Sequence, residues 1–309
     1  MNATVPQPYR SYASYLRDRF GGAVRKVPIN AGFSCPNLDG TTSREGCAFC
    51  ANRAFSPAVD NAGSPVEQLE AALHRGWGRK AVGCLAYLQP YSNTYGPASR
   101  LRGICEPLLT IPGVVGIVVG TRPDCLPKEI LDYLAKLAER TYVSVELGLQ
   151  SSHDATLKLH NRGHGYREFE DAVKALAGRG IESSTHVILG LRGETAPMMM
   201  ETARRLSRLP VSGVKIHQLM ILEGTLVHRW FEQNLIEPFS LEDYAQRVAG
   251  FISLLRPDQV VHRIMADARP ERGLVAPGWS ADKVGSVLLL RDYFRDSGLV
   301  QGSRYEPDG

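Results

Sequence analysis

Long hydrophobic runs are missing from this 309-residue chain, and no stretch approaches the roughly 20 apolar residues that a helix needs to cross a bilayer. Residues 1–10 also lack a charged segment followed by an apolar one, so we expect no secretory signal. We therefore expect a cytoplasmic protein with no membrane partner. Linkers rich in Gly, Ser and Pro, low-complexity tracts and fixed-period repeats are absent too, which excludes solenoids and repeat arrays.

Neither sign of charge dominates the composition. The 36 Lys and Arg residues against 32 Asp and Glu give a net charge of +4, a mild excess that permits a polyanionic partner without requiring one. An apolar fraction of 43% and a charged fraction of 22% are ordinary for a folded globular protein. The length suits one α/β barrel, or a core domain with small additions.

Cysteine is scarce and unevenly distributed. Three of the six cysteines, Cys35, Cys47 and Cys50, fall in one loop, with no histidine near enough in sequence to complete a tetrahedral zinc site. Soft thiolates select zinc, copper(I) or iron–sulfur clusters. Three of them suit a [4Fe–4S] cluster whose fourth iron is open to an exogenous ligand.

Two other interpretations use the same three cysteines. A zinc knuckle could be completed by a distant Cys or His. A disulfide with one free thiol is the other, although nothing else in the chain suggests an oxidising compartment. The isolated Cys84 and Cys105 stand in apolar surroundings, and we expect them and Cys125 to pack in the core rather than to hold a second cluster.

The cysteine loop carries Cys-Pro-Asn-x-Asp-Gly-Thr and closes with Gly-Cys-x-Phe-Cys. In this it resembles the radical S-adenosylmethionine (SAM) enzymes, in the branch that includes the Elongator catalytic subunit and the oxygen-independent coproporphyrinogen oxidases. The resemblance extends from about Lys26 to about Ala268. It implies that the three cysteines hold a [4Fe–4S] cluster, that SAM binds the open iron, and that an electron donor such as flavodoxin or ferredoxin reduces the cluster.

Apolar runs alternate with helical patterns along the chain. Strands are expected at 23–29, 84–88, 114–119, 142–147, 182–189 and 213–219. Between them, helices are expected from 64 onward and at 101–109, 127–137, 166–177 and 198–209. This order predicts parallel pairing and an α/β fold, a partial six-stranded (β/α)6 TIM-like barrel.

The barrel is expected to carry additions at both ends. An N-terminal helix is predicted within 9–20. Beyond Leu241 the sequence predicts a helix at 243–255, a short apolar run at 260–264 and a last helix at 283–294. The predicted domains are an N-terminal helical extension (1–22), a radical SAM core barrel (23–268) and a C-terminal flank (269–309).

Active sites of (β/α) barrels lie at the C-terminal ends of the strands, where several runs here end in polar residues. The resemblance assigns Glu146 and Gln150 to SAM, and Gln89 and Asn93 to the SAM amino group. Buried polar groups of SAM need such partners. The alternatives are an ion pair of Glu146 with a barrel arginine, a helix cap for Gln150, and an ordinary loop around Gln89.

Two further stretches resemble motifs of the same branch. Gly190 lies in a turn that the family uses against adenine, with Arg192 in place of the usual proline; a purely structural turn is the alternative. Arg162, in Asn-Arg-Gly-His, offers a planar fork suited to the carboxylate of SAM or to an anionic substrate. A solvated surface loop is the alternative for that stretch.

Lys215 and His217 fall on the same face of the sixth predicted strand, because side chains alternate along a strand. If that face is the barrel interior, both point toward substrate and are candidate catalytic residues. The alternative is an exposed edge strand. His262 and Arg263 are candidates of the same kind.

The resemblance implies reductive cleavage of SAM to methionine and a 5′-deoxyadenosyl radical, which abstracts hydrogen from substrate. The Elongator likeness suggests tRNA, at the wobble uridine, as substrate, with basic residues to follow the phosphates: Arg75, Arg79, Lys80, Arg100 and Arg102. The chain is expected to lack the acetyltransferase domain of the Elongator enzyme. A radical SAM reaction on a small molecule and a zinc-containing nucleic-acid-binding protein are the alternatives.

Overall fold

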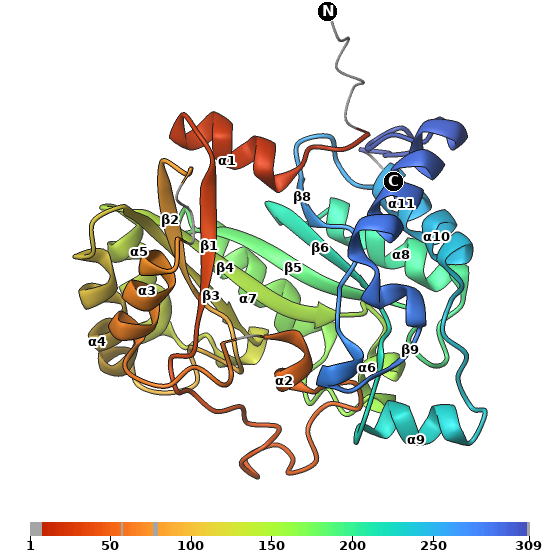
Figure 1. Ribbon diagram of the computed structural model, residues 1–309, viewed down its shortest axis with the longest axis horizontal. Helices are drawn as coiled ribbons and strands as arrows, with labels where there is room; N and C mark the ends of the chain where they lie inside the picture. The colour runs from red at the N-terminus through yellow and green to blue at the C-terminus, as the bar shows by residue number, and fades with distance from the viewer. Residues whose placement is uncertain (1–7, 57, 77–79, 308–309) are drawn as a thin grey trace, which may run out of the picture.

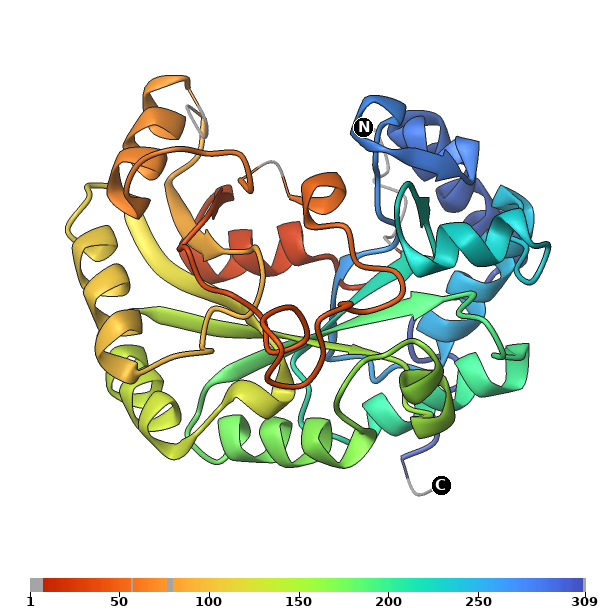
Figure 2. The ribbon, with the colours of Figure 1, turned by 90° about the horizontal axis from the view of Figure 1, so that it is seen from below.

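Seven parallel strands form a single curled sheet in the computed structural model, which describes residues 8–56, 58–76 and 80–307. The strands are β1 (Val24–Ile29), β2 (Gly83–Leu88), β3 (Val114–Thr121), β4 (Tyr142–Gln150), β5 (Glu182–Leu189), β6 (Gly213–Gln218) and β8 (Val260–Arg263). They pair in the order in which the chain forms them, and the sheet curls into a half-barrel (Figure 2). The predicted partial α/β barrel is confirmed, and the short run near 260 extends it by a seventh strand.

Helices cover the convex face of the sheet and protect the apolar strands from water on that side (Figure 1). They are α3 (Pro65–His74), α4 (Ala98–Leu109), α5 (Lys128–Ala138), α7 (Tyr166–Ala177), α8 (Ala196–Ser207) and α10 (Leu241–Ser253). The start of α3 shows why a helix begins there. Ser64 Oγ accepts a hydrogen bond from the Glu67 amide at 3.3 Å, and the Ser64 amide donates to the Glu67 carboxylate at 2.6 Å.

The helix α1 (Tyr12–Phe20) packs against both edge strands, β1 and β8, at the N-terminal ends of the strands. The Tyr12 ring stacks on His262 with centroids 3.9 Å apart, and Leu16 is buried among inward-facing residues of the sheet. Tyr15 donates to the carboxylate of Glu182, at the start of β5, over 2.5 Å. The N-terminal helix was predicted, and it closes one end of the half-barrel.

Several short elements were not predicted, because each is too brief to show a periodic pattern. They are the helices α2 (Asn52–Phe55), α6 (Asp154–Leu159) and α9 (Leu226–Glu232), and an antiparallel pair formed by β7 (Ile221–Leu222) and β9 (Leu274–Ala276). The last helix, α11 (Lys283–Ser297), places Leu290 and Phe294 in the main hydrophobic core. No helix in the described part of the chain is long and apolar enough to span a membrane.

Candidate functional site

The loop that follows β1 carries the three cysteines across the C-terminal ends of the strands, at the opposite end of the half-barrel from α1 (Figures 1 and 2). All three thiols border one cavity of about 210 Å³. Cys47 is buried, Cys35 is half-buried and Cys50 is exposed. The prediction that one loop brings these thiols to the active end of the barrel agrees with this arrangement.

Backbone carbonyls of residues 160–162 and the side chain of Asn161 hold the cysteine loop in place. The side-chain amide of Asn37 donates to the backbone carbonyl of Asn161 at 2.6 Å. The side-chain amide of Asn161 donates in turn to the backbone carbonyl of Gly46 at 2.7 Å. The Ala48 amide donates to the His160 carbonyl at 2.9 Å. The Asn-Arg-Gly-His stretch is therefore the support of the cysteine loop, not a solvated surface loop.

Glycine is required at position 163 by this close packing. Its φ of +74° lies in the left-handed region, and a Cβ there would stand 2.4 Å from the Asn37 Oδ1. Any larger residue would push the cysteine loop away from its support.

Arg162 lies against a cysteine rather than in open cavity space. Its Nη1 stands 3.3 Å from Cys47 Sγ, and its Nη2 donates to the carbonyl of Gly148 at 2.6 Å. A Cβ at Gly148 would meet that Nη2 at 2.6 Å, so the glycine permits the approach. The Asn37 amide also reaches Cys47 Sγ, at 3.4 Å.

The donor set fits an iron–sulfur cluster. Cluster thiolates commonly accept N–H hydrogen bonds, and here Cys47 receives two. Arg162 Nε is buried without a hydrogen-bond partner among the described residues, and so one more N–H is free for an acceptor at this wall. In the described part of the chain, no three His, Cys, Asp or Glu side chains stand close enough together to hold a metal ion, so the structure shows no closed zinc site there.

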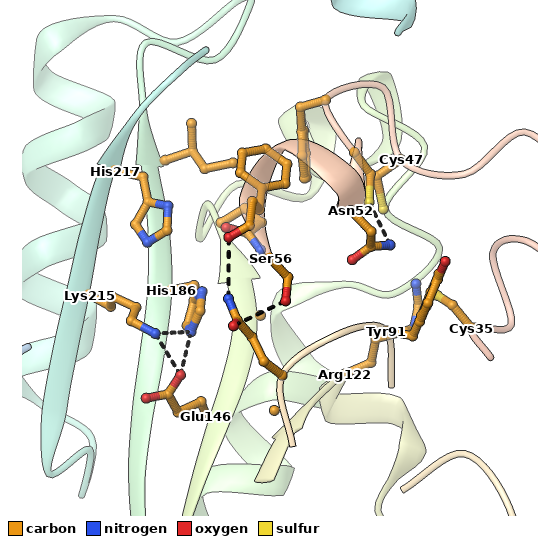
Figure 3. Close-up of a pocket in the computed structure, with 18 of the residues that line it drawn as sticks. Cys35, Cys47, Asn52, Ser56, Tyr91, Arg122, Glu146, His186, Lys215 and His217 are labelled. Atoms are coloured by element: carbon orange, nitrogen blue, oxygen red, sulfur yellow. Dashed lines mark hydrogen bonds and ion pairs between the residues drawn. The ribbon is translucent and has the colours of Figure 1, made fainter. Parts of the chain in front are cut away.

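A charged cluster forms the other side of the cavity (Figure 3). The buried Glu146 carboxylate accepts hydrogen bonds from Lys215 at 2.7 Å and from the Tyr87 hydroxyl at 2.5 Å, and it also binds Lys26. His186 Nε2 lies 3.1 Å from the same carboxylate. Glu146 is thus paired with two lysines. The sequence suggests an ion pair with a barrel arginine as the alternative to SAM binding, and the structure shows an ion pair whose partners are lysines.

Burial and mutual charge set the protonation of this cluster. Burial alone would raise the pKa of Glu146, but Lys215 and Lys26 hold that pKa well below its usual range. Burial lowers the pKa of Lys215 to about 7 against the attraction of Glu146, and the Lys26 charge adds to the lowering. Burial also lowers the pKa of His186 to about 4, assisted by Lys215, so this imidazole is neutral at pH 7.

Lys215 and His217 both lie on the cavity wall, and they come from β6, which pairs with strands on both sides. The exposed-edge alternative is therefore excluded for this strand. The His217 Nε2 is buried and has no hydrogen-bond partner within the described ranges. Burial, together with the Arg263 charge, holds the pKa of His217 well below its usual value.

The other predicted ligands of SAM differ in how they face the cavity. Gln89 and Gln150 line it, and Gln89 is held by Ser56 at 3.2 Å. Asn93 lies within its loop, where its amide donates to three backbone carbonyls; only its Oδ1 lacks a partner among the residues described. Gly190 is not a wall residue, and its φ of +93° and packing against Phe239 suit a structural turn.

Some wall residues were not singled out from the sequence. Arg122 forms a two-point ion pair with Asp124 at 2.9 and 2.7 Å and donates to the Arg162 carbonyl at 2.8 Å. The polar ending after β3 was the signal that could have found it. Tyr87 could not have been found, because it lies within an apolar run typical of a buried strand.

The described residues among those proposed to follow RNA phosphates do not line the cavity. Arg75, Lys80, Arg100 and Arg102 are exposed, and Arg79 is outside the described residues. Arg100 lies over the Phe33 ring at 4.4 Å. The remaining cysteines Cys84, Cys105 and Cys125 are buried, as expected for packing residues.

Comparison with known proteins gives two family matches. The family described as "Radical SAM superfamily" matches residues 41–206, and the family described as "Radical_SAM C-terminal domain" matches residues 211–295. The uncharacterized protein YtqA of Bacillus subtilis is 38% identical over 305 residues, which cover 96% of this chain and 93% of the relative. Protein YhcC of Escherichia coli is 36% identical, covering 93% of this chain and 92% of that protein.

More distant relatives are longer than this chain. A tRNA uridine(34) acetyltransferase of Methanocaldococcus infernus is 30% identical over 190 residues, which cover 60% of this chain but only 34% of that enzyme. The solved structure of archaeal Methanocaldococcus infernus Elp3 superposes with a TM-score of 0.67 at 18% identity, covering 91% of this chain and 64% of that one. At that identity the likeness shows the fold alone.

Proposed function

Because this chain belongs to the radical SAM superfamily, whose enzymes use a [4Fe–4S] cluster and SAM, we propose that Cys35, Cys47 and Cys50 bind the cluster and that SAM occupies the cavity beside them. When bound and reduced, the cluster supplies one electron that cleaves SAM to methionine and a 5′-deoxyadenosyl radical. The observation that carries this proposal is the set of three thiols on one cavity wall with Arg162 and Asn37 donating to Cys47.

The protein's own share is to orient the ligands and to exclude water. We assign Gln89, Gln150 and Glu146 to SAM, since all three line the cavity. Asn93 is buried and does not line the cavity, and its Oδ1, unpartnered within the described residues, is the atom we assign to the SAM amino group. We assign Gly190 to adenine on the resemblance of its turn alone, because this glycine does not line the cavity.

Lys215 and His217 are the proposed catalytic residues. Both face the cavity. The neutral His217 imidazole can donate or accept a hydrogen bond at Nε2 according to its tautomer, while Lys215 can hold or release a proton near neutral pH. An electron donor such as flavodoxin or ferredoxin and a cytoplasmic location, where thiols stay reduced, complete the proposal.

Two substrate classes have separate support. A tRNA substrate, modified at the wobble uridine, is supported by the relatives named tRNA uridine(34) acetyltransferase and Elongator complex protein 3, although this chain spans only about a third of each. A small-molecule substrate is supported by the charged side of the cavity, formed by Lys215, His217 and Arg263 above Glu146, which we call the floor of the cavity. These groups suit an acidic ligand. A zinc-containing nucleic-acid-binding protein finds no support in the family matches.

The test of the proposed chemistry is replacement of each cluster cysteine by alanine. Anaerobically reconstituted wild type should contain about four irons, absorb broadly in the visible and cleave SAM under dithionite. The variants should lose SAM cleavage, whereas Cys105→Ala, in the core on α4, should retain it. Reductive cleavage by the cysteine variants at the wild-type rate would refute the proposal.

The tRNA substrate is tested separately. Mass spectrometry of tRNA nucleosides from a strain that lacks the gene should show a modified uridine lost or a precursor gained. An unchanged nucleoside profile would remove RNA as substrate and leave the radical chemistry unaffected.

A further inference from the structure

The floor of the cavity has more positive than negative charge. Lys26 and Lys215 share the single carboxylate of Glu146, and the imidazoles of His186 and His262 are neutral because burial lowers the pKa of each to about 4. The nearby Arg263 pairs with Asp267 at 3.2 Å, and Asp267, which also lines the cavity, is shared with Lys283 at 3.0 Å. Among the described residues, the two lysines around Glu146 leave one positive charge without a counter-ion when both are protonated. Burial lowers the pKa of Lys26 and brings the pKa of Lys215 to about 7, so at pH 7 this surplus is a fraction of one charge, and it grows as the pH falls.

An uncompensated buried charge is costly, and the surroundings offset only part of the cost. The Lys26 ammonium lies 3.9 Å from the centroid of the Tyr87 ring, a cation–π contact that stabilises it beneath the floor. Lys215 has one short hydrogen bond, to Glu146, while the Tyr87 hydroxyl and His186 Nε2 are both 3.4 Å from its Nζ. Lys215 thus keeps donor capacity toward the cavity.

The groups beside Lys215 point to a ligand that accepts hydrogen bonds. His217 and Arg263 line the same floor, and the buried His217 Nε2 has no partner in the described part of the chain. Figure 3 shows Lys215 and His217 on one side of the cavity and Cys35 and Cys47 on the other. A ligand that reached from one side to the other would place its far end on Lys215.

We propose that Lys215, His217 and Arg263, above the Glu146–Lys26 pair, bind an acidic group of the substrate, either a carboxylate or a terminal phosphate. This inference rests on the proposed function only in taking the cavity as the substrate site. A neutral nucleobase turned into the cavity would bring no charge to this floor. The substrate class that the floor favours is therefore a small organic acid or phosphate ester.

The test measures anion binding to the full-length, cluster-loaded protein by calorimetry, without reductant. Acetate and inorganic phosphate are titrated separately, and the tighter of the two identifies the acidic group. Lys215→Met should weaken binding of that anion at least about tenfold, or 1.4 kcal/mol. The matched control Lys128→Met, at an exposed site on α5, should bind as the wild type does.

Lys26→Met tests whether the anion is attracted by the excess positive charge around Glu146 or only by direct contact with Lys215. Lys26 is not a wall residue, yet its removal leaves one lysine for one carboxylate, so anion affinity should fall by about the same factor. This second variant also keeps the test valid if Lys215→Met fails to fold.

The inference is overturned if the wild type shows no saturable binding of either anion, or if both lysine variants bind as tightly as the wild type. Competition by tRNA with no binding of acetate or phosphate would also overturn it, in favour of RNA. SAM cleavage measured on the same preparations separates this result from the proposed function. Intact cleavage without anion binding would refute only the anion site, and anion binding without cleavage only the radical chemistry.

Discussion

At the scale of single residues, Arg162 connects the sequence motif to the cluster. From the sequence, the Arg162 guanidinium is expected to bind SAM or an anionic substrate. In the structure its Nη1 lies 3.3 Å from Cys47 Sγ. That the three cysteines come together on one loop could be predicted, because their spacing is local in sequence. The place of Arg162 could not, because its partner is 115 residues away and meets it only when the two loops pack.

We predict that Arg162→Gln lowers the reduction potential of the cluster by about 60 mV, a tenfold change for a one-electron couple. Loss of a positive charge and an N–H donor at Cys47 disfavours the more negative, reduced cluster. Redox titration followed by electron paramagnetic resonance measures the midpoint. Arg204→Gln, at an exposed site on α8, should leave it unchanged; an unchanged midpoint in Arg162→Gln at equal iron content would contradict the prediction.

Buried neutral imidazoles make stability depend on pH. Burial lowers the pKa of His262 to about 4, below its unfolded value near 6.5, so the unfolded chain binds more protons between these values. The free energy of unfolding should therefore fall as the pH decreases from about 6.5 toward 4. At pH 5 we expect this residue to account for about 1–2 kcal/mol of the loss.

Denaturant unfolding at pH 7.5 and pH 5 measures this loss. The variant His262→Asn cannot gain the proton, so it should lose less stability between the two values than the wild type. His74→Asn, at an exposed position of α3, provides the matched control. Equal losses in wild type and His262→Asn would show that this imidazole is not responsible.

At the scale of elements, the strands and long helices could be predicted, because apolar runs and helical periodicity are local signals. The strand β8 was seen only as a short run, since its four residues give no alternation to count. That α1 joins the two edges of the half-barrel could not be predicted either. This contact depends on the curl of the whole sheet and not on the pattern within the helix.

Removal of the Leu16 side chain tests the role of α1. Leu16 is 3% exposed and packs with inward residues of the sheet, so Leu16→Ala should reduce the free energy of unfolding by about 2–4 kcal/mol. Arg17→Ala, on the exposed side of the same helix, should change it by less than about 0.5 kcal/mol. Chemical denaturation provides both values, and a similar small effect in the two variants would mean that α1 does not close the barrel.

At the scale of the whole molecule, one hydrophobic core runs from Val27 in β1 to Phe294 in α11. The predicted C-terminal flank therefore shares its core with the barrel. We predict that far-UV circular dichroism and tryptophan fluorescence report the same denaturant midpoint, because the two segments unfold together. Leu290→Ala, in α11, should shift both midpoints equally. A fluorescence transition at lower denaturant than the circular dichroism transition would mean that the flank unfolds separately.

The support beneath the cysteine loop also sets an order of events in biosynthesis. Residues 35–50 depend on hydrogen bonds from residues 160–162, which a ribosome adds more than a hundred residues later. The growing chain cannot arrange its three thiols until the fourth strand and the segment after it have folded. If these thiols bind the cluster as proposed, we expect iron to be loaded after this part of the chain has folded, onto an apoprotein and not onto a nascent chain.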